Sequence, residues 1–305
     1  MKRKSIIITI FCMALMCSIL FALSACGTGG GEQNDIGTDG LVFDSLGSGN
    51  DCIVSGYTGS EGIVVIPKTY NGMRVVQIRE KAFSGKNNLI RITIPDSVTN
   101  IGYDAFGGCT SLASVYYTGD VASWCRITFD SSYQTNPLHY AHNLYINNKL
   151  VTYLIIPDEV TEIKKNAFVG ATCFTDASIP NSVTSIGDGA FAHCNALKSI
   201  TIGSRVTSIG VDAFAECTSL ASVTIPHGVR EIEMEAFYNC TALTSVTIPN
   251  SVMKINWSAF KSCSALTNIT FNGTKAQWNA INKVSGWNTY TGSYTIHCFD
   301  GDIAK

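Results

Sequence analysis

Apolar and polar positions along this chain follow a pattern that repeats every 23 residues over most of its length. The dipeptide Ala-Phe marks the period, with its Phe at positions 83, 106, 168, 191, 214, 237 and 260. Between these marks runs a Leu-x-x-Val-x-Ile pattern, as from Leu220 to Ile225, in which apolar residues alternate with Thr. Such alternation predicts a short strand with one buried face, and the Pro that follows, such as Pro226, ends its pairing.

A second short extended segment follows in each unit, with two inward apolar residues such as Val229 and Ile232. The Ala-Phe pair then lies on a predicted short helical or 3-10 turn, where the ring fills the interior of the coil. One coil of 23 residues cannot bury its apolar face alone, so successive coils must stack. The pattern predicts a repeat solenoid that is rich in β-strand.

The repeat resembles a known family. The segment Ile-Pro-Asn-Ser-Val-Thr-Ser-Ile-Gly-Asp-Gly-Ala-Phe-Ala-His-Cys, from Ile179 to Cys194, is similar to the BspA-like leucine-rich repeat. The resemblance covers roughly residues 41–305. It implies an extracellular or surface-attached leucine-rich-repeat solenoid, and some members of the family are adhesins for host or matrix proteins. A fold of this kind serves many functions, so the resemblance by itself does not fix one.

Departures from the period suggest internal boundaries. We expect an N-terminal cap at 41–70, repeats at 71–115, an irregular aromatic insertion at 116–155, repeats at 156–271 and a C-terminal cap at 272–305. The insertion begins with a strand, a Gly turn and a stretch ending at Trp124, and a similar stretch ends at Trp278. A hairpin of two strands, 143–146 and 151–154, is predicted around the turn 147–149.

The N-terminus has the pattern of an export signal. Lys2 to Lys4 is basic and Ile6 to Leu23 is apolar, after which Leu-Ser-Ala-Cys resembles the lipobox of bacterial lipoproteins. We therefore expect residues 1–25 to be a signal peptide, Cys26 to carry the lipid, and 26–40 to be a flexible Gly-rich tether. The alternative is an uncleaved helix that anchors the chain. Either way the solenoid would be exported, held on the bacterial cell membrane and facing outside the cytoplasm.

The charge composition limits the classes of molecule that the chain is expected to bind. Only 14% of the residues are charged and the net charge is −2, which becomes more negative when Lys2, Arg3 and Lys4 are removed with the signal. Without a basic surface, nucleic acid is excluded as a partner. The expected partners are an extracellular protein or glycan, together with the membrane through the N-terminal lipid.

Cysteine is the main candidate for chemistry, with 12 in an exported chain. Five lie three residues after a repeat Phe and should form an inward file: Cys109, Cys194, Cys217, Cys240 and Cys263. Buried free thiols are the favoured interpretation, with disulfides or a metal as alternatives. No Cys-x-x-Cys pair supports a metal. Outside the file, Cys52, Cys125, Cys173 and Cys298 cannot be paired from sequence.

Catalysis is not indicated. His139 and His142 are spaced three residues apart, but two histidines without a nearby carboxylate do not complete a metal site. The chain has no nucleophile elbow, zinc-protease motif, phosphate loop or dinucleotide fingerprint. We expect no enzyme, no catalytic residue, no metal and no cofactor.

Two surface features suggest binding. Strand alternation turns one Thr per coil outward, and stacking would align Thr201, Thr224 and Thr247 in a hydroxyl ladder. The same ladder would keep an exposed sheet soluble without any ligand. In the insertion, the candidate ligand-binding residues are Tyr116, Tyr117, Trp124 and Tyr133, although these rings could instead pack the irregular coil.

The sequence thus predicts a cell-surface lipoprotein whose solenoid serves protein binding or adhesion to host, matrix or other cells. The alternatives are a structural envelope scaffold without a specific ligand and a carbohydrate-binding accessory protein.

Overall fold

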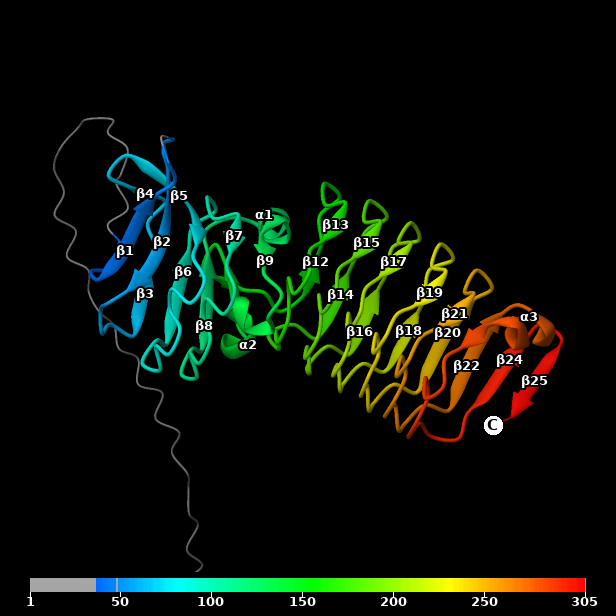
Figure 1. Ribbon diagram of the computed structural model, residues 1–305. Helices are drawn as coiled ribbons and strands as arrows, with labels where there is room; N and C mark the ends of the chain where they lie inside the picture. Colours follow the sequence, from blue (N-terminus) through cyan, green and yellow to red (C-terminus); the bar gives the residue numbers. More distant parts are fainter. Residues whose placement is uncertain (1–36, 48, 305) are drawn as a thin grey trace, which may run out of the picture. The chain divides into compact units, whose positions relative to one another are not determined.

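Each repeat contributes two strands, and successive repeats stack these strands in parallel, as the computed structural model shows (Figure 1). Strand β18 (Ser222–Thr224) of one repeat pairs with β20 (Ser245–Pro249) of the next, and β19 (Glu231–Ile232) pairs with β21 (Lys254–Ile255) in the same way. The structure describes residues 37–47 and 49–304, all within the unit Asn34–Lys305. The predicted β-rich repeat solenoid is confirmed. The predicted signal peptide, Cys26 and the tether up to residue 36 lie outside the described residues.

The first strand row follows the Leu-x-x-Val-x-Ile pattern. It comprises three hydrogen-bonded sheets, ordered β11-β10-β8-β6-β3, β12-β14-β16 and β18-β20-β22-β24-β25. Besides β18 and β20, its strands are β3 (Ile63–Val65), β6 (Arg91–Ile94), β8 (Ser114–Tyr117), β10 (Leu144–Ile146), β11 (Lys149–Leu150), β12 (Leu154–Ile155), β14 (Asp176–Ser178), β16 (Ser199–Thr201), β22 (Asn268–Asn272), β24 (Thr295–Cys298) and β25 (Gly301–Ala304).

The second strand row follows the Val-x-x-Ile pattern, and its sheets are ordered β1-β2-β5-β7-β9, with β4 also on β5, then β13-β15-β17 and β19-β21-β23. Besides β19 and β21, its strands are β1 (Leu41–Ser45), β2 (Asp51–Tyr57), β4 (Thr69–Tyr70), β5 (Met73–Ile78), β7 (Asn100–Ile101), β9 (Thr128–Phe129), β13 (Glu162–Ile163), β15 (Ser185–Ile186), β17 (Ser208–Ile209) and β23 (Asn282–Lys283).

The core lies between the two rows and is filled by the repeat phenylalanines. Phe191, Phe214 and Phe237 are fully buried, and each ring stacks on the next with centroids 5.3 and 5.4 Å apart. Each Phe also donates its backbone N–H to the coil that follows, as Phe214 does to Ala236. Rings and backbone therefore link neighbouring coils together, which confirms the inward placement of Phe.

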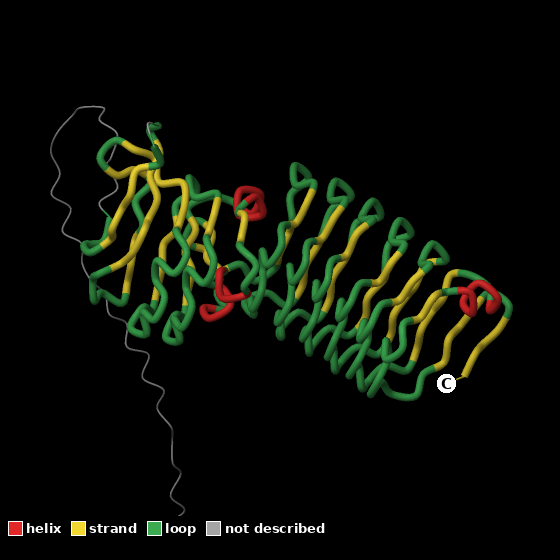
Figure 2. The backbone as a smooth tube through the Cα atoms, viewed as in Figure 1, coloured by secondary structure: helices red, strands yellow, loops and turns green. Residues whose placement is uncertain are grey.

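The segment that carries Ala-Phe forms consecutive tight turns rather than the helical or 3-10 turn predicted. The residue before Ala-Phe has a positive φ in every unit: Lys81, Asp104, Asn166, Gly189, Asp212, Glu235 and Ser258. The second residue after Phe does too: Gly85, Gly108, Gly170, His193, Glu216, Asn239 and Ser262. Left-handed residues on both sides of the pair interrupt a right-handed helix. Figure 2 shows these segments as loops, and the helices among the described residues are few and short.

The predicted insertion 116–155 is an enlarged coil that keeps its place in the stack. Its strand β9 pairs in parallel with β7 of the coil before it, and β10 pairs in parallel with β8, the strand at which the insertion begins. Helix α1 (Val121–Arg126) lies between β8 and β9, and the 3-10 helix η1 (Tyr133–Thr135) and helix α2 (Leu138–Ala141) lie between β9 and β10. Asp120 caps α1, accepting a hydrogen bond from the Ser123 N–H at 2.7 Å.

The hairpin predicted there is shorter than expected. Strand β10 pairs with β11 at Lys149–Leu150, not with 151–154. Asn147 and Asn148 have φ angles of 50° and 62°, which is the type I′ conformation that closes a two-residue turn. Leu154 instead belongs to β12, which starts a new sheet.

The ends of the solenoid differ from the predicted caps. Strand β3 already pairs with β6, so the first coil begins within 41–70, and the antiparallel pair β1–β2 covers it. At the C-terminal end, helix α3 (Lys275–Ala280) precedes β23, and the hairpin β24–β25 closes the first strand row. Irregular ends shield the core that a repeat array would otherwise expose.

Candidate binding surface

The hydroxyl ladder forms in the predicted register. Thr224 pairs with Thr247, and Thr201 pairs with Ser178 in the neighbouring sheet. Thr201 and Thr224 are exposed and Thr247 is half-buried. Because no strand pairing joins β16 to β18, the ladder passes from one sheet to another between Thr201 and Thr224. The pairing of Thr224 with Thr247 is confirmed, the step from Thr201 to Thr224 is not made by strand pairing, and a role of the ladder in ligand binding stays a prediction.

On the same outward face, aromatic and aliphatic side chains replace the hydroxyls near the middle of the row. Tyr116 stacks on Tyr145 with ring centroids 4.4 Å apart and planes 3° apart. Leu150 lies opposite Tyr145 across the β10–β11 hairpin and is 38% exposed. In the next coil Tyr153 and Ile155 flank the buried Leu154 and are 54% and 61% exposed. Tyr116, Tyr145 and Leu150 at the end of one sheet, together with Tyr153 and Ile155 at the start of the next sheet of the row, are called the aromatic patch.

Arg91 borders the aromatic patch. The guanidinium carbon of Arg91 lies 4.9 Å from the centre of the Tyr116 ring, in cation–π geometry. Arg91 of β6 pairs with Ser114 of β8, and its guanidinium lies over Tyr116 on the outward face of the sheet. The buried Nε of Arg91 has no hydrogen-bond partner among the described residues. The patch thus combines apolar rings with a positive charge at its edge.

Two of the predicted ligand-binding residues are buried. Tyr117 occupies the inward position of β8 and is 2% exposed, because strand alternation turns it away from the face that carries Tyr116. Trp124 is fully buried, and its indole N–H donates to the Ala167 carbonyl at 2.8 Å. The prediction that these two side chains contact a ligand is wrong: they pack the enlarged coil against the next one.

Tyr133 has a structural contact of its own. Its hydroxyl donates to Asp212 Oδ2 at 3.0 Å, and its ring lies edge-on to His193. Burial, and then the negative charge of Asp212, raise the pKa of Tyr133. The ring lies over Gly189, where a Cβ would come within 2.7 Å of Tyr133 Cε1. Tyr133 therefore connects the enlarged coil to the repeats that follow it. It also lines a cavity of about 400 Å³.

The cysteine file faces inward as predicted. The Cys217 thiol donates a hydrogen bond to the Phe191 carbonyl, and the other four file thiols make the equivalent bond, from Cys109 to Phe83, Cys194 to Phe168, Cys240 to Phe214 and Cys263 to Phe237. The cysteines that the structure describes, including Cys52, Cys125, Cys173 and Cys298, are free thiols.

The histidine pair does not converge. His142 Nδ1 contacts the Gly170 carbonyl at 2.7 Å, whereas His139 packs beside His193. Burial, followed by the charges of His193 and His142, lowers the pKa of His139. Within residues 37–47 and 49–304, no group of three or more His, Cys, Asp or Glu side chains is placed to hold a metal ion.

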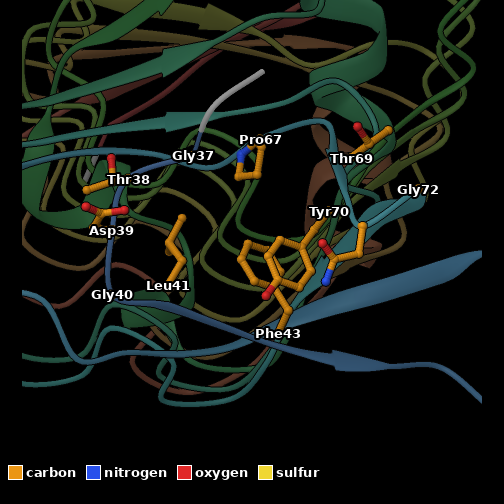
Figure 3. Close-up of a pocket in the computed structure, with 11 residues that line it drawn as sticks. Gly37, Thr38, Asp39, Gly40, Leu41, Phe43, Pro67, Thr69, Tyr70 and Gly72 are labelled. Carbon is orange, nitrogen blue, oxygen red and sulfur yellow. The ribbon is translucent and has the colours of Figure 1, made fainter. Parts of the chain in front are cut away.

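A pocket that the sequence did not predict lies in the N-terminal cap (Figure 3). It measures about 470 Å³ and lies between β1 and the hairpin of β4 and β5. Phe43 and Tyr70 stack on one side of it, with ring centroids 4.0 Å apart. Its only sequence signal is Asn71-Gly72, the residue pair typical of a two-residue hairpin turn. We call it the cap pocket.

The predicted membrane attachment cannot be located in the structure, since Cys26 lies outside the described residues. Across the described part of the chain, none of the helices has the length and apolar character needed to cross a bilayer.

Comparison with known proteins agrees with the repeat. The model of the BspA type leucine rich repeat region matches in six copies, over residues 66–171 and 140–267. A leucine-rich repeat protein from Bacteroides ovatus is 24% identical, with a TM-score of 0.56, over 85% of this chain and 67% of that one. The leucine-rich repeat protein of T. pallidum is 27% identical, with a TM-score of 0.43, over 74% and 88% of the two chains.

A leucine-rich cell surface protein from Faecalibacterium prausnitzii is 25% identical, with a TM-score of 0.37, over 82% of this chain and 98% of that one. No curated protein matches the chain. The family match spans more than half of the sequence and coincides with the 23-residue coils seen in the structure. The chain therefore belongs to the BspA type leucine rich repeat family.

Proposed function

We propose that this chain is an exported, lipid-anchored binding protein that holds a protein ligand on its aromatic patch. The solenoid fold of the family is compatible with protein binding or adhesion. The finer assignment depends on one observation: the outward face changes from hydroxyls to exposed rings and aliphatic chains at the aromatic patch. Exposed apolar groups gathered in one place are typical of interaction sites, and Tyr is enriched among residues that dominate binding energy.

The patch favours a ligand of particular chemistry. Its residues project from a sheet face, which suits the surface of another protein. Tyr153 and Ile155, more than half exposed, would be buried by apolar side chains of that protein. Arg91 at the edge favours a carboxylate of the ligand, because its guanidinium already stacks on Tyr116 and offers several N–H donors. The expected partner is a protein with an apolar surface and an adjacent acidic residue.

Export and anchoring complete the proposal. The basic, apolar and Leu-Ser-Ala-Cys segments at the N-terminus support a lipid on Cys26. Replacing Cys26 with Ala should abolish labelling by a radioactive fatty acid and release the protein from the membrane fraction. Retention of the variant in membranes without label would instead indicate an uncleaved helix.

Arrays of immobilised matrix proteins test whether the chain binds a protein ligand through the aromatic patch. The purified full chain should bind at least one of them saturably, and binding should fall about tenfold or more when Tyr153 or Ile155 is changed to Ala. Tyr290→Ala is the matched control, because Tyr290 is 76% exposed and lies near the C-terminal end of the chain, far along the sequence from the patch.

Three results would contradict this proposal. Uniformly negative arrays would favour the structural scaffold. Binding that survives both patch variants would place the site elsewhere. Self-association of the chain that these variants abolish, seen by analytical ultracentrifugation, would assign the patch to contacts between copies.

A further inference from the structure

The cap pocket has the composition of a small-molecule site and is separate from the aromatic patch. Its volume of about 470 Å³ falls within the range of roughly 300–1,000 Å³ that is usual for such sites. Leu41 and Pro67 contribute aliphatic surface, and the stacked rings of Phe43 and Tyr70 contribute a flat apolar surface (Figure 3). Tyr70 is 39% exposed, so part of its ring remains accessible to a ligand.

Polar groups surround this apolar surface. The carboxylate of Asp39, the hydroxyl of Thr69 and the amide of Asn71 line the pocket and are exposed. Among the hydrogen bonds and ion pairs of the described residues, none involves these three side-chain groups. They offer donors and acceptors together, and no Lys or Arg lines the pocket. A ligand would therefore meet one flat apolar surface and a ring of free polar groups.

We propose that the cap pocket binds a neutral carbohydrate ring. A sugar ring presents C–H groups on one face, which pack on an aromatic ring, and hydroxyls around its rim, which both donate and accept hydrogen bonds. Asp39 can accept from two adjacent hydroxyls, and Asn71 can donate to one and accept from another. An anionic ligand has no cation to pair with in the lining.

A quaternary ammonium ligand is the main competitor, because aromatic rings and a carboxylate also bind cations. Such ligands are held in a cage of rings whose faces surround the charge. Here Phe43 and Tyr70 are nearly parallel, 13° apart, with one ring against the other. They provide one flat surface and no cage, which favours the sugar.

The backbone holds the pocket in shape. Asn71 and Gly72, with φ angles of 50° and 78°, form the type I′ turn that places Tyr70 beside β1. Thr38 and Val65 exchange two hydrogen bonds. The Thr38 N–H donates to the Val65 carbonyl at 3.1 Å, and the Thr38 hydroxyl accepts from the Val65 N–H at 2.8 Å. The backbones of Gly40 and Gly59 pack so closely that a Cβ added at position 40 would lie 2.5 Å from the backbone nitrogen of Gly59. Such preorganisation reduces the entropy lost on binding.

Saturation-transfer NMR on the purified full chain tests the proposal. The probes are the methyl glycosides of glucose, galactose, mannose and N-acetylglucosamine, with choline chloride as the cation probe. At least one glycoside should bind saturably. Tyr70→Ala should weaken its binding by about tenfold, and Asp39→Asn should weaken it as well, whereas Tyr70→Phe, which keeps the ring, should largely retain it.

Matched controls lie elsewhere on the chain. Tyr290→Ala and Asp158→Asn remove an exposed ring and an exposed carboxylate far along the sequence from the cap, and both should bind the glycoside normally. Failure of every glycoside, preference for choline, or binding that persists in Tyr70→Ala would each overturn the proposal. Tyr153→Ala should leave glycoside binding unchanged, so failure of the protein-binding role and failure of this site are distinguishable.

Discussion

The thiol of Cys217 donates a hydrogen bond to the backbone carbonyl of Phe191 in the preceding coil, with 3.2 Å between sulfur and oxygen. Both residues are fully buried. The same bond recurs along the cysteine file, so a side chain that the sequence presents as a small buried group also joins one coil to the next.

This bond makes the file sensitive to loss of the thiol. Cys217→Ala should lower the free energy of unfolding by about 0.5–3 kcal/mol, because the core loses a buried sulfur atom together with its hydrogen bond to the Phe191 carbonyl, which still accepts from the Cys194 N–H. Guanidinium denaturation followed by circular dichroism measures the change. Cys298→Ala, at a half-buried position outside the file, should cost less than about 0.5 kcal/mol. Equal losses for the two variants would mean that the file bond contributes nothing.

Burial should also protect the file from alkylation. It raises the pKa of the Cys109 thiol to about 11 and that of Cys263 to about 12, and only the thiolate reacts readily. In native protein at pH 8, iodoacetamide should modify the more accessible Cys298 first and reach the file only after denaturant is added. Peptide mass spectrometry follows each site. Modification of Cys217 as fast as Cys298 in native protein would contradict its placement in the core.

Removing a ring from the core should be more costly than removing a thiol. Phe214 stacks between Phe191 and Phe237, so Phe214→Ala leaves a cavity and should lower the free energy of unfolding by about 3–5 kcal/mol. Thermal and chemical denaturation measure it. Met253→Ala, which removes a side chain 63% exposed, serves as the control. A melting temperature that does not change in Phe214→Ala would be incompatible with the stacked core.

The contact between Tyr133 and Gly189 should appear in a double-mutant cycle. Gly189 has a positive φ that Asn tolerates, but a side chain there meets the Tyr133 ring at 2.7 Å. Gly189→Asn should therefore destabilise the protein, and should do so less when Tyr133 is already Ala. The expected coupling is about 0.5–3 kcal/mol, measured by denaturation of the four proteins. Strict additivity would show that the two residues do not touch.

Glu235 should make stability depend on pH. Burial, and then the neighbouring Asp212, raise the pKa of Glu235 above its ordinary value of 4.5. The charged carboxylate of Glu235 is therefore less stable in the folded than in the unfolded protein, which lowers the free energy of unfolding at neutral pH. This destabilisation disappears once the pH falls below the pKa of Glu235 in the unfolded chain, because the group is then protonated in both states. Glu235→Gln should thus melt higher than the parent at pH 7, with a difference that shrinks below about pH 4.5.

Melting curves recorded between pH 4 and pH 8 measure this difference, with Glu159→Gln, on an exposed turn far along the sequence from Glu235 and Asp212, as the matched control. A difference that grows on acidification would reverse the sign of the proposed effect.

The sequence by itself determined the coils. A period of 23 residues fixes which side chains face inward, because strand alternation and stacking allow only one arrangement that buries Phe214 and Cys217 while exposing Thr224. The same logic predicted the register of Thr224 with Thr247. Because each coil repeats the pattern of its neighbour, a side chain contacts the residue at the same repeat position in the next coil, and the sequence pattern therefore predicts the tertiary contact.

Only the tertiary structure decided what happens where the period fails. Tyr116 and Tyr117 are adjacent in β8, where strand alternation turns them to opposite faces, and the pairing of β8 with β6 shows that the Tyr117 face is the buried one. Trp124 and Tyr133 hold the enlarged coil against later coils, since they donate hydrogen bonds to Ala167 and Asp212, which lie far along the chain. The cap pocket likewise needs Phe43 and Tyr70 from separate strands. Such contacts have no periodic signal, because they form between segments that do not repeat.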